Sequence, residues 1–159
     1  MKKALYPGTF DPITLGHIDI IHRAFHLFEE VTIAIATSEA KTPLFSVEER
    51  INQIGLIFKG DKRIRCIGFT GLVVDLAKEE ETNVLIRGLR AVSDFEYEFQ
   101  LANMNRAMSP DLESIFLTPK AKFSFLSSTL VREIASMGGK LSSFVDPIVE
   151  EALKNRFKA

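Results

Sequence analysis

The chain has 159 residues, of which 46% are hydrophobic and 26% charged, and its 20 basic side chains nearly balance its 21 acidic ones. A domain takes about 100–200 residues, so this length and a lone cysteine predict one domain over residues 1–159 without a disulfide framework. The net charge of −1 argues against broad electrostatic capture of nucleic acid or of an anionic membrane. No stretch approaches the roughly 18 apolar residues of a membrane span, so we expect a cytoplasmic protein with no nucleic-acid or membrane partner.

Short apolar runs predict five strands, over residues 4–6, 31–36, 64–67, 84–86 and 115–117. They show little polar alternation, which is typical of strands covered on both faces of a parallel sheet. Helical patterns lie between them. A stripe of Ile18, Ile21, Phe25 and Phe28 predicts the first helix, a capping box at residues 46–49 opens the second, and further helices are expected over residues 72–80, 92–108, 128–137 and 147–157. This alternation predicts an α/β fold with an open, doubly wound, five-stranded parallel sheet.

The predicted helix over residues 92–108 carries apolar residues on two sides. One stripe contains Phe95, Phe99 and Ala102, and the opposite one contains Tyr97, Leu101, Met104 and Met108. We expect one stripe to cover the sheet. The other needs a second partner, which is either the C-terminal helix or another subunit.

Residues with binding chemistry follow the first predicted strand, where open α/β sheets bind ligands. Gly8 allows close backbone approach, and Thr9 offers a hydroxyl and an N–H group. Gly16 and His17 stand at the start of the first helix, where free N–H groups and the helix dipole favour anions. The charge state of His17 is left open by the sequence. The glycine patterns of the common dinucleotide fold and of the P-loop do not follow this strand.

Cationic and hydroxyl side chains follow three other strands. Arg87 and Arg90 flank a glycine after the fourth strand, and Lys41 follows the second. They predict phosphate contacts, although solvated surface residues are the alternative interpretation. The serine- and threonine-containing segment 123–129 opens a helix that carries Arg132, which predicts a second phosphate-binding helix start.

The remaining histidines give no metal site. His22 and His26 are four residues apart, but no third ligand accompanies them, and we expect both to be solvated. No metal ligand is therefore predicted. The sequence also lacks the G-x-S-x-G motif of a serine hydrolase.

Five segments together resemble the bacterial phosphopantetheine adenylyltransferases, a family of the nucleotidyltransferase superfamily with the [HT]-x-G-H motif. The segments are YPGTFDP at 6–12, TLGH at 14–17, IRGLRA at 86–91, DFEYE at 94–98 and FLSST at 125–129. The resemblance runs from about Ala4 to Leu153. It implies a Rossmann-like nucleotidyltransferase fold and transfer of the adenylyl group of ATP to 4′-phosphopantetheine. The products would be dephospho-coenzyme A and pyrophosphate, in coenzyme A biosynthesis.

The resemblance also implies roles for individual positions. It makes His17 the transition-state stabiliser, with Lys41 and Arg90 as further catalytic donors. The implied ATP-binding positions are Thr9, Phe10, His17, Gly88, Leu89, Arg90, Glu98, Phe123, Ser124, Phe125, Leu126, Ser127, Ser128 and Thr129. The implied acceptor-binding positions are Thr9, Lys41, Val73 and Arg87. Phe123 stands where many members have Trp, Thr129 where many have Ser, and Val73 where some have the larger Met.

The implied mechanism is an in-line attack without a covalent intermediate, and it needs no general base because the attacking phosphate is already anionic. Mg²⁺ is expected to be carried by the ATP phosphates. The hexameric members of the superfamily agree with the second apolar stripe and suggest a homohexamer. Two alternatives remain: another adenylyl- or cytidylyltransferase, acting on nicotinate mononucleotide or a glycerol phosphate, and a nucleotide-binding regulatory module without turnover.

Overall fold

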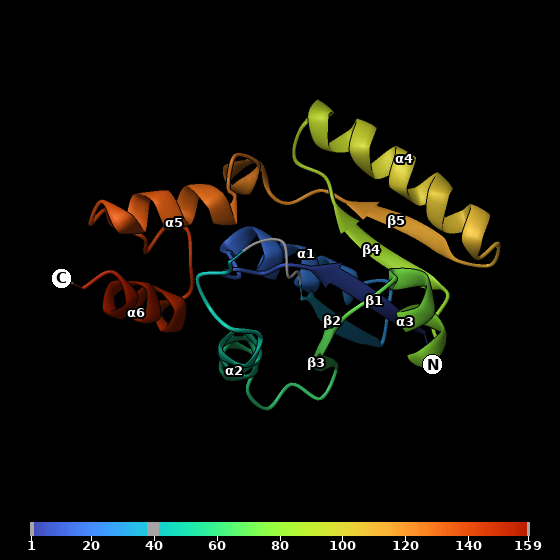
Figure 1. Cartoon of the computed structure of the whole chain (residues 1–159), viewed down its shortest axis with the longest axis horizontal. Coiled ribbons are helices and arrows are strands. Elements are labelled where there is room, and N and C mark those ends of the chain that lie inside the picture. The colour runs from blue at the N-terminus through green and yellow to red at the C-terminus, as the bar shows by residue number, and fades with distance from the viewer. Residues whose placement is uncertain (1, 38–41, 159) are drawn as a thin grey trace.

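The computed structural model describes residues 2–37 and 42–158, which form a parallel sheet with helices on both faces (Figure 1). The strands are β1 (Lys3–Gly8), β2 (Glu30–Ala36), β3 (Ile64–Phe69), β4 (Val84–Gly88) and β5 (Glu113–Leu117). Their order is β3-β2-β1-β4-β5, and each neighbouring pair is parallel. The expected open, doubly wound, five-stranded sheet is confirmed.

The helices lie close to the positions expected from the sequence. They are α1 (Leu15–Ala24), α2 (Val47–Ile57), α3 (Val73–Glu79), α4 (Val92–Met108), α5 (Ser128–Ser136) and α6 (Pro147–Arg156), with a short 3₁₀ helix, η1 (Ala121–Phe123). The capping box that opens α2 is present, since Ser46 Oγ accepts the N–H of Glu49 over 3.1 Å. In Figure 1 the carboxyl ends of the strands point toward α5.

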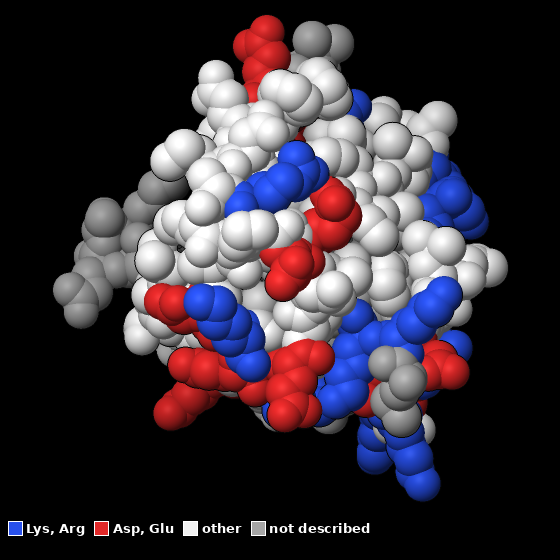
Figure 2. Space-filling view, turned by 90° about the vertical axis from the view of Figure 1, so that its right-hand side faces the viewer, with Lys and Arg blue, Asp and Glu red and all other residues white. Residues whose placement is uncertain are grey.

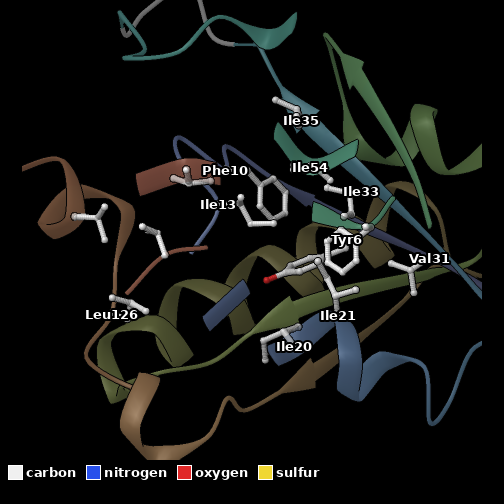
Figure 3. Packing of buried hydrophobic residues seen from close by; sticks show 14 of the residues in the cluster. Tyr6, Phe10, Ile13, Ile20, Ile21, Val31, Ile33, Ile35, Ile54 and Leu126 are labelled. Atoms are coloured by element: carbon white, nitrogen blue, oxygen red, sulfur yellow. The ribbon is translucent and has the colours of Figure 1, made fainter. Parts of the chain in front are cut away.

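Alternate residues of the central strands bury two separate apolar cores. On one face Tyr6 and Ile33 pack with Ile21 of α1 and Ile54 of α2 (Figure 3). On the other face, Leu5 of β1, Ala34 of β2 and Leu85 of β4 form a second core with Leu76 of α3. Burial of each large side chain contributes about 1.5–3 kcal/mol, so these cores hold the sheet as a rigid base for its carboxyl edge.

The edge strands are less covered than the sequence predicts. In β3 the side chain of Arg65 and the backbone of Gly68 are exposed, and β5 is mostly half-buried. An edge strand has a neighbour on one side only, so the flanking helices shield it incompletely. The interpretation of strands covered on both faces therefore holds for β1, β2 and the middle of β4, and is wrong for β3 and β5.

Helix α4, which runs beside β4 and β5 in Figure 1, does not cover the sheet with an apolar stripe. Over residues 94–108 of this helix, the buried side chains are those of the polar Glu98 and Asn105, at 7% and 6% exposure. Phe95 and Phe99 are 49% and 54% exposed, and most of the opposite stripe is exposed as well. The expectation that one stripe packs on the sheet is wrong, because polar residues face inward on this helix and one of them, Glu98, is ion-paired with Arg87 of β4.

Charged side chains of both signs share the surface at the end of the molecule opposite the carboxyl edge. Figure 2 shows Asp/Glu and Lys/Arg groups side by side along the lower part of this face, with fewer charges above. No single sign of charge dominates this view, in agreement with the net charge of −1.

Candidate active site

A pocket of about 320 Å³ opens at the carboxyl ends of β1 and β4. The chain moves outward from β1 to β2 and β3 and then returns to β4 on the other side of β1, which makes this the switch point of the sheet. Open α/β sheets bind ligands at such a point. The pocket is lined by both strand ends, the start of α1, the first half of α4 and the segment that leads into α5.

Phe10 supports one wall of this pocket from within the core. Its φ of 49° is left-handed, and its side chain is only 3% exposed. The ring lies edge-on to Tyr6, with 5.1 Å between ring centroids (Figure 3), and 4.9 Å from the ring of His17. A Cβ on Gly8 would lie 2.9 Å from the Phe10 ring, so glycine is required there for this packing.

His17 lies in the first turn of α1 and forms a reciprocal cap with Thr14. The backbone N–H of His17 donates to Thr14 Oγ1 over 3.3 Å, and the backbone N–H of Thr14 donates to Nδ1 of the His17 ring over 3.0 Å. Burial, followed by the positive charge of Arg90, lowers the pKa of His17 to about 4. The ring is therefore neutral at pH 7, which answers the question that the sequence left open.

The start of α1 also presents a backbone donor to the pocket. The N–H of Leu15 donates to Phe144 O over 2.9 Å, and that of His17 is capped by Thr14. Among the described residues, the N–H of Gly16 has no such partner, and Gly16 lines the pocket. An N–H at a helix start favours an anion, so this edge of the pocket is suited to phosphate.

Arg87 and Glu98 form a bidentate ion pair across the pocket floor. Arg87 Nε and Nη2 donate to the Glu98 carboxylate over 2.8 and 2.7 Å, and Nη1 donates to Pro7 O over 2.9 Å. Burial lowers the pKa of Arg87, but the hydrogen bonds and charge of Glu98 outweigh it and leave that pKa above its usual value. The pair joins β1, β4 and α4 at one point.

Arg90 connects the β4–α4 loop to the segment before α5. Its Nη1 donates to Leu126 O over 2.6 Å, and its Nε lies 3.2 Å from the Asp94 carboxylate. The side chain remains 39% exposed and lines the pocket beside His17. A fixed guanidinium at this position can stabilise negative charge on a bound ligand.

The start of α5 closes the opposite wall. Ser127 caps the helix by accepting the N–H of Leu130 over 3.1 Å, and Ser128 Oγ donates to Pro12 O over 2.7 Å. Two of the predicted hydroxyls therefore have structural partners. Thr129 is exposed and lines the pocket, and its hydroxyl is within 3.4 Å of Arg132.

Sequence reasoning did not show how the loop after β1 is held: it missed Arg50 and the role of Asp11, and it assigned Arg132 to a phosphate-binding helix start. Arg50, which is 2% exposed, donates to Thr9 O over 2.7 Å, and Arg132 donates to Asp11 O over 2.5 Å. The Asp11 carboxylate accepts the N–H groups of Leu44 and Phe45 over 2.8 and 3.0 Å. Arg50 and Asp11 gave no local signal, because their partners are more than 30 residues away in sequence.

A second pocket, of about 260 Å³, adjoins the first. It is lined by Asp11, Thr42, Arg50 and Arg132, and it shares Thr9, Ser128 and Thr129 with the main pocket. The two arginines are tied to the backbone carbonyls of Thr9 and Asp11. The loop after β1 is thus held between the two pockets.

The structure brings most of the sequence-predicted site residues to the main pocket. Those that line it are Thr9, Phe10, His17, Arg87, Gly88, Arg90, Glu98, Phe123, Leu126, Ser127, Ser128 and Thr129. Leu89, Ser124, Phe125 and Val73 are not part of its lining; Val73 packs against the second core, and Phe125 is 62% exposed beside Phe144. Lys41 lies outside the described residues.

In residues 2–37 and 42–158 no group of three or more His, Cys, Asp or Glu side chains is placed to hold a metal ion. In the same ranges no helix has the length and apolar character needed to cross a membrane. The two carboxylates that line the main pocket, Asp94 and Glu98, are each paired with an arginine.

Comparison with known proteins agrees with this geometry. Residues 5–134 match the model of the cytidylyltransferase-like family. The fold is similar to that of a putative nicotinate-nucleotide adenylyltransferase from Vibrio parahaemolyticus, with a TM-score of 0.74 over 100% of this chain and 98% of that one, at 19% sequence identity. The matched residues include β1, α1, β4 and the start of α5, which build the pocket. The chain therefore belongs to the cytidylyltransferase-like family of nucleotidyltransferases.

Proposed function

We propose that this protein transfers the adenylyl group of ATP to 4′-phosphopantetheine, giving dephospho-coenzyme A and pyrophosphate. The observation that carries this proposal is that all five segments with the family resemblance contribute to one pocket. Two of these segments, around Arg87 and Glu98, are joined there by an ion pair. The resemblance in these segments, rather than the fold, favours this acceptor over others.

The pocket supports catalysis by positioning and electrostatics. The oxygen of the acceptor phosphate attacks the α-phosphorus of ATP, the bond from that phosphorus to the bridging oxygen breaks, and pyrophosphate leaves. Both pocket carboxylates are paired with arginines, and an anionic nucleophile needs no base. His17, Arg90 and the N–H of Gly16 are the donors for the charge that develops on the phosphates, with Lys41 proposed as a further donor.

The two substrates are assigned to different parts of the site. We place ATP against His17, Arg90, Glu98 and the start of α5. The acceptor phosphate is placed against Thr9, which lines both pockets, and Arg87, which lines the main one. Mg²⁺ enters as part of the ATP substrate, because phosphate oxygens are ligands that it prefers.

The test is pyrophosphate release with each combination of nucleotide and acceptor. ATP or CTP would be supplied with 4′-phosphopantetheine, nicotinate mononucleotide or glycerol 3-phosphate. We expect turnover with ATP and 4′-phosphopantetheine to exceed every other combination in kcat/KM by at least about 10³-fold, as a site that binds one acceptor's polar groups rejects others. A preference for nicotinate mononucleotide would show that this compound, and not 4′-phosphopantetheine, is the acceptor. ATP binding without turnover would indicate a regulatory module.

We further propose that α4 packs against other copies of this chain in a homohexamer. The exposed apolar side chains on its two flanks are Phe95, Tyr97, Phe99, Met104 and Met108, at 47–62% exposure. So many large apolar groups on one helix exceed what an isolated surface helix normally exposes. Between the two flanks, the outermost residues are polar, including Glu96 and Gln100.

Substitution on this helix tests the assembly. Met104→Glu places a charge in the proposed apolar contact, and light scattering is expected to show particles of lower mass than the wild type. Gln100→Glu is the matched control, because it adds the same charge to the outer polar side, and it is expected to leave the mass unchanged. A monomeric wild type at micromolar concentration would contradict the interface.

A further inference from the structure

The hydroxyl of Tyr6 is a polar group of the main pocket that has no partner in the described protein. Tyr6 lies in β1, is 5% exposed and lines the pocket. Within residues 2–37 and 42–158 no group hydrogen-bonds to its Oη, and the enclosed side-chain atom without a partner there is Gln53 Oε1, not Tyr6 Oη. The Tyr6 oxygen is therefore open to the pocket rather than sealed in the core.

Packing does not explain this hydroxyl. The ring of Tyr6 packs edge-on against Phe10, at 5.1 Å between ring centroids, and in Figure 3 its oxygen points away from Val31, toward the side of the core on which Leu126 lies. A phenylalanine would make the same ring contacts without a polar atom to satisfy. A largely buried hydroxyl that gives up water and gains no partner costs free energy, so it indicates an acceptor that arrives with a ligand.

The surroundings keep the hydroxyl protonated and accessible. Burial raises the pKa of Tyr6 above its usual value and outweighs the positive charges of Arg87 and Arg90, which lower it. The charge of Glu98 also acts on this hydroxyl, but both carboxylate oxygens of Glu98 accept from Arg87. A Cβ at position 88 would lie 3.7 Å from Tyr6 Oη, so Gly88 leaves the approach to this oxygen uncovered. Tyr6 thus offers a neutral donor in the field of two arginines.

We propose that Tyr6 is a substrate-binding residue whose hydroxyl donates to a phosphate oxygen of a bound substrate. This rests on the proposed function in that ATP and 4′-phosphopantetheine both bring phosphate to this pocket. Phosphate is the ligand group that fits, because the hydroxyl lies in the positive field of Arg87 and Arg90 and shares the pocket with the N–H of Gly16. Tyr6 is outside the set of positions to which the family resemblance gives a role.

The first test is Tyr6→Phe, which removes the oxygen and keeps the ring. We expect calorimetric titration to show an affinity for ATP or for 4′-phosphopantetheine that is lower by about 10–150-fold, the effect of losing a hydrogen bond to a charged group. The substrate that is weakened supplies the phosphate. Adenosine and pantetheine, which lack phosphate, should bind to Tyr6→Phe within about twofold of the wild type. If neither substrate is weakened, or if the phosphate-free compounds are weakened equally, the proposal is wrong.

The ligand-free variant distinguishes a contact with substrate from a structural role. Because the hydroxyl has no partner in the described protein, Tyr6→Phe should have a urea unfolding midpoint equal to or above that of the wild type. A lower midpoint would show that the hydroxyl is bound within the protein and would overturn the proposal. The matched control is Tyr97→Phe, which removes the hydroxyl of an exposed tyrosine that does not line the pocket and should leave the midpoint and the ATP affinity unchanged.

The same control variant allows Tyr6 to be observed directly. The chain has two tyrosines, so Tyr97→Phe labelled with ¹³Cζ-tyrosine gives the NMR signal of Tyr6 alone. We expect this signal to move when ATP or 4′-phosphopantetheine binds and to stay in place with adenosine or pantetheine. No movement with either phosphate-containing substrate would overturn the contact. A wild type that binds ATP but not 4′-phosphopantetheine contradicts the proposed acceptor, and the ATP titrations then decide the role of Tyr6.

Discussion

Replacing His17 with alanine is expected to lower kcat by about 10²–10³-fold, while ATP affinity changes by less than about tenfold. The ring lines the pocket with an unpaired Nε2–H, beside Arg90 and the N–H of Gly16. Charge accumulates on the α-phosphate only as the new bond forms, so a donor aimed there stabilises the transition state more than the bound substrate. Loss of one preorganised donor of this kind has an effect of this size. Steady-state pyrophosphate release and an ATP titration on the same variant measure both quantities.

The control is His22→Ala, the same substitution at an exposed position of α1. It should leave kcat within about twofold of the wild type, because His22 does not line the pocket. His17→Ala leaves the Thr14 N–H without its ring acceptor, so some loss of stability, of about 1 kcal/mol, is expected. A thermal unfolding scan separates this from the catalytic effect. If kcat of His17→Ala stays within a few-fold of the wild type, His17 has no catalytic role.

The sequence predicted the sheet well because its signals are local. The runs that became β1, β2 and β4 are almost continuously apolar. The cap at Ser46 and the proline at the first helical position, Pro147, mark helix starts that the structure reproduces. Motif segments at the carboxyl ends of β1 and β4 then meet at one edge, since parallel strands share that edge. The location of the site at the carboxyl edge therefore followed from the predicted parallel sheet, whereas the order of its strands comes from the structure.

The parts that could not be predicted depend on contacts between distant residues. Helix α4 has a regular pattern of apolar residues, yet its inner side carries the buried polar residues Glu98 and Asn105, and Glu98 is paired with Arg87 of β4. The spacing of apolar residues along a helix does not show that an arginine of a neighbouring strand forms an ion pair with it. The same holds for Arg50, whose sequence environment is that of an ordinary helical arginine although it is buried against Thr9 O.

The protonation state of His17 could not be predicted either, although one of the contacts that affect it is local. The TLGH segment predicts a histidine at a helix start, but the protonation state depends on burial, on Arg90 and on the Thr14 N–H. The Thr14 N–H is only three residues from His17 in sequence. It donates to Nδ1 because the two residues form the reciprocal cap at the start of α1. Only the folded arrangement shows that the cap uses Nδ1 and leaves Nε2 to the pocket.

The ion pair between Arg87 and Glu98 is expected to give the largest stability effect in the site. The side chains are 23% and 9% exposed and are joined by two hydrogen bonds. Arg87→Met leaves the Glu98 carboxylate without its partner in a largely buried position, which should lower the free energy of unfolding by about 3 kcal/mol. The matched control is Arg106→Met, which breaks an exposed pair of the same helix and should cost less than about 1 kcal/mol. Urea unfolding of both variants measures the difference.

The double variant Arg87→Met/Glu98→Gln separates stability from binding. Removing the negative charge together with the positive one relieves the unpaired carboxylate, so we expect the double variant to recover at least half of the stability that Arg87→Met loses. Acceptor affinity should not recover, because Arg87 is proposed to bind the acceptor phosphate, and loss of that charged hydrogen bond weakens binding by about 10–150-fold. Calorimetric titration with 4′-phosphopantetheine and with ATP gives the two affinities. If stability and acceptor affinity recover together, Arg87 holds α4 against β4 and makes no contact with the acceptor.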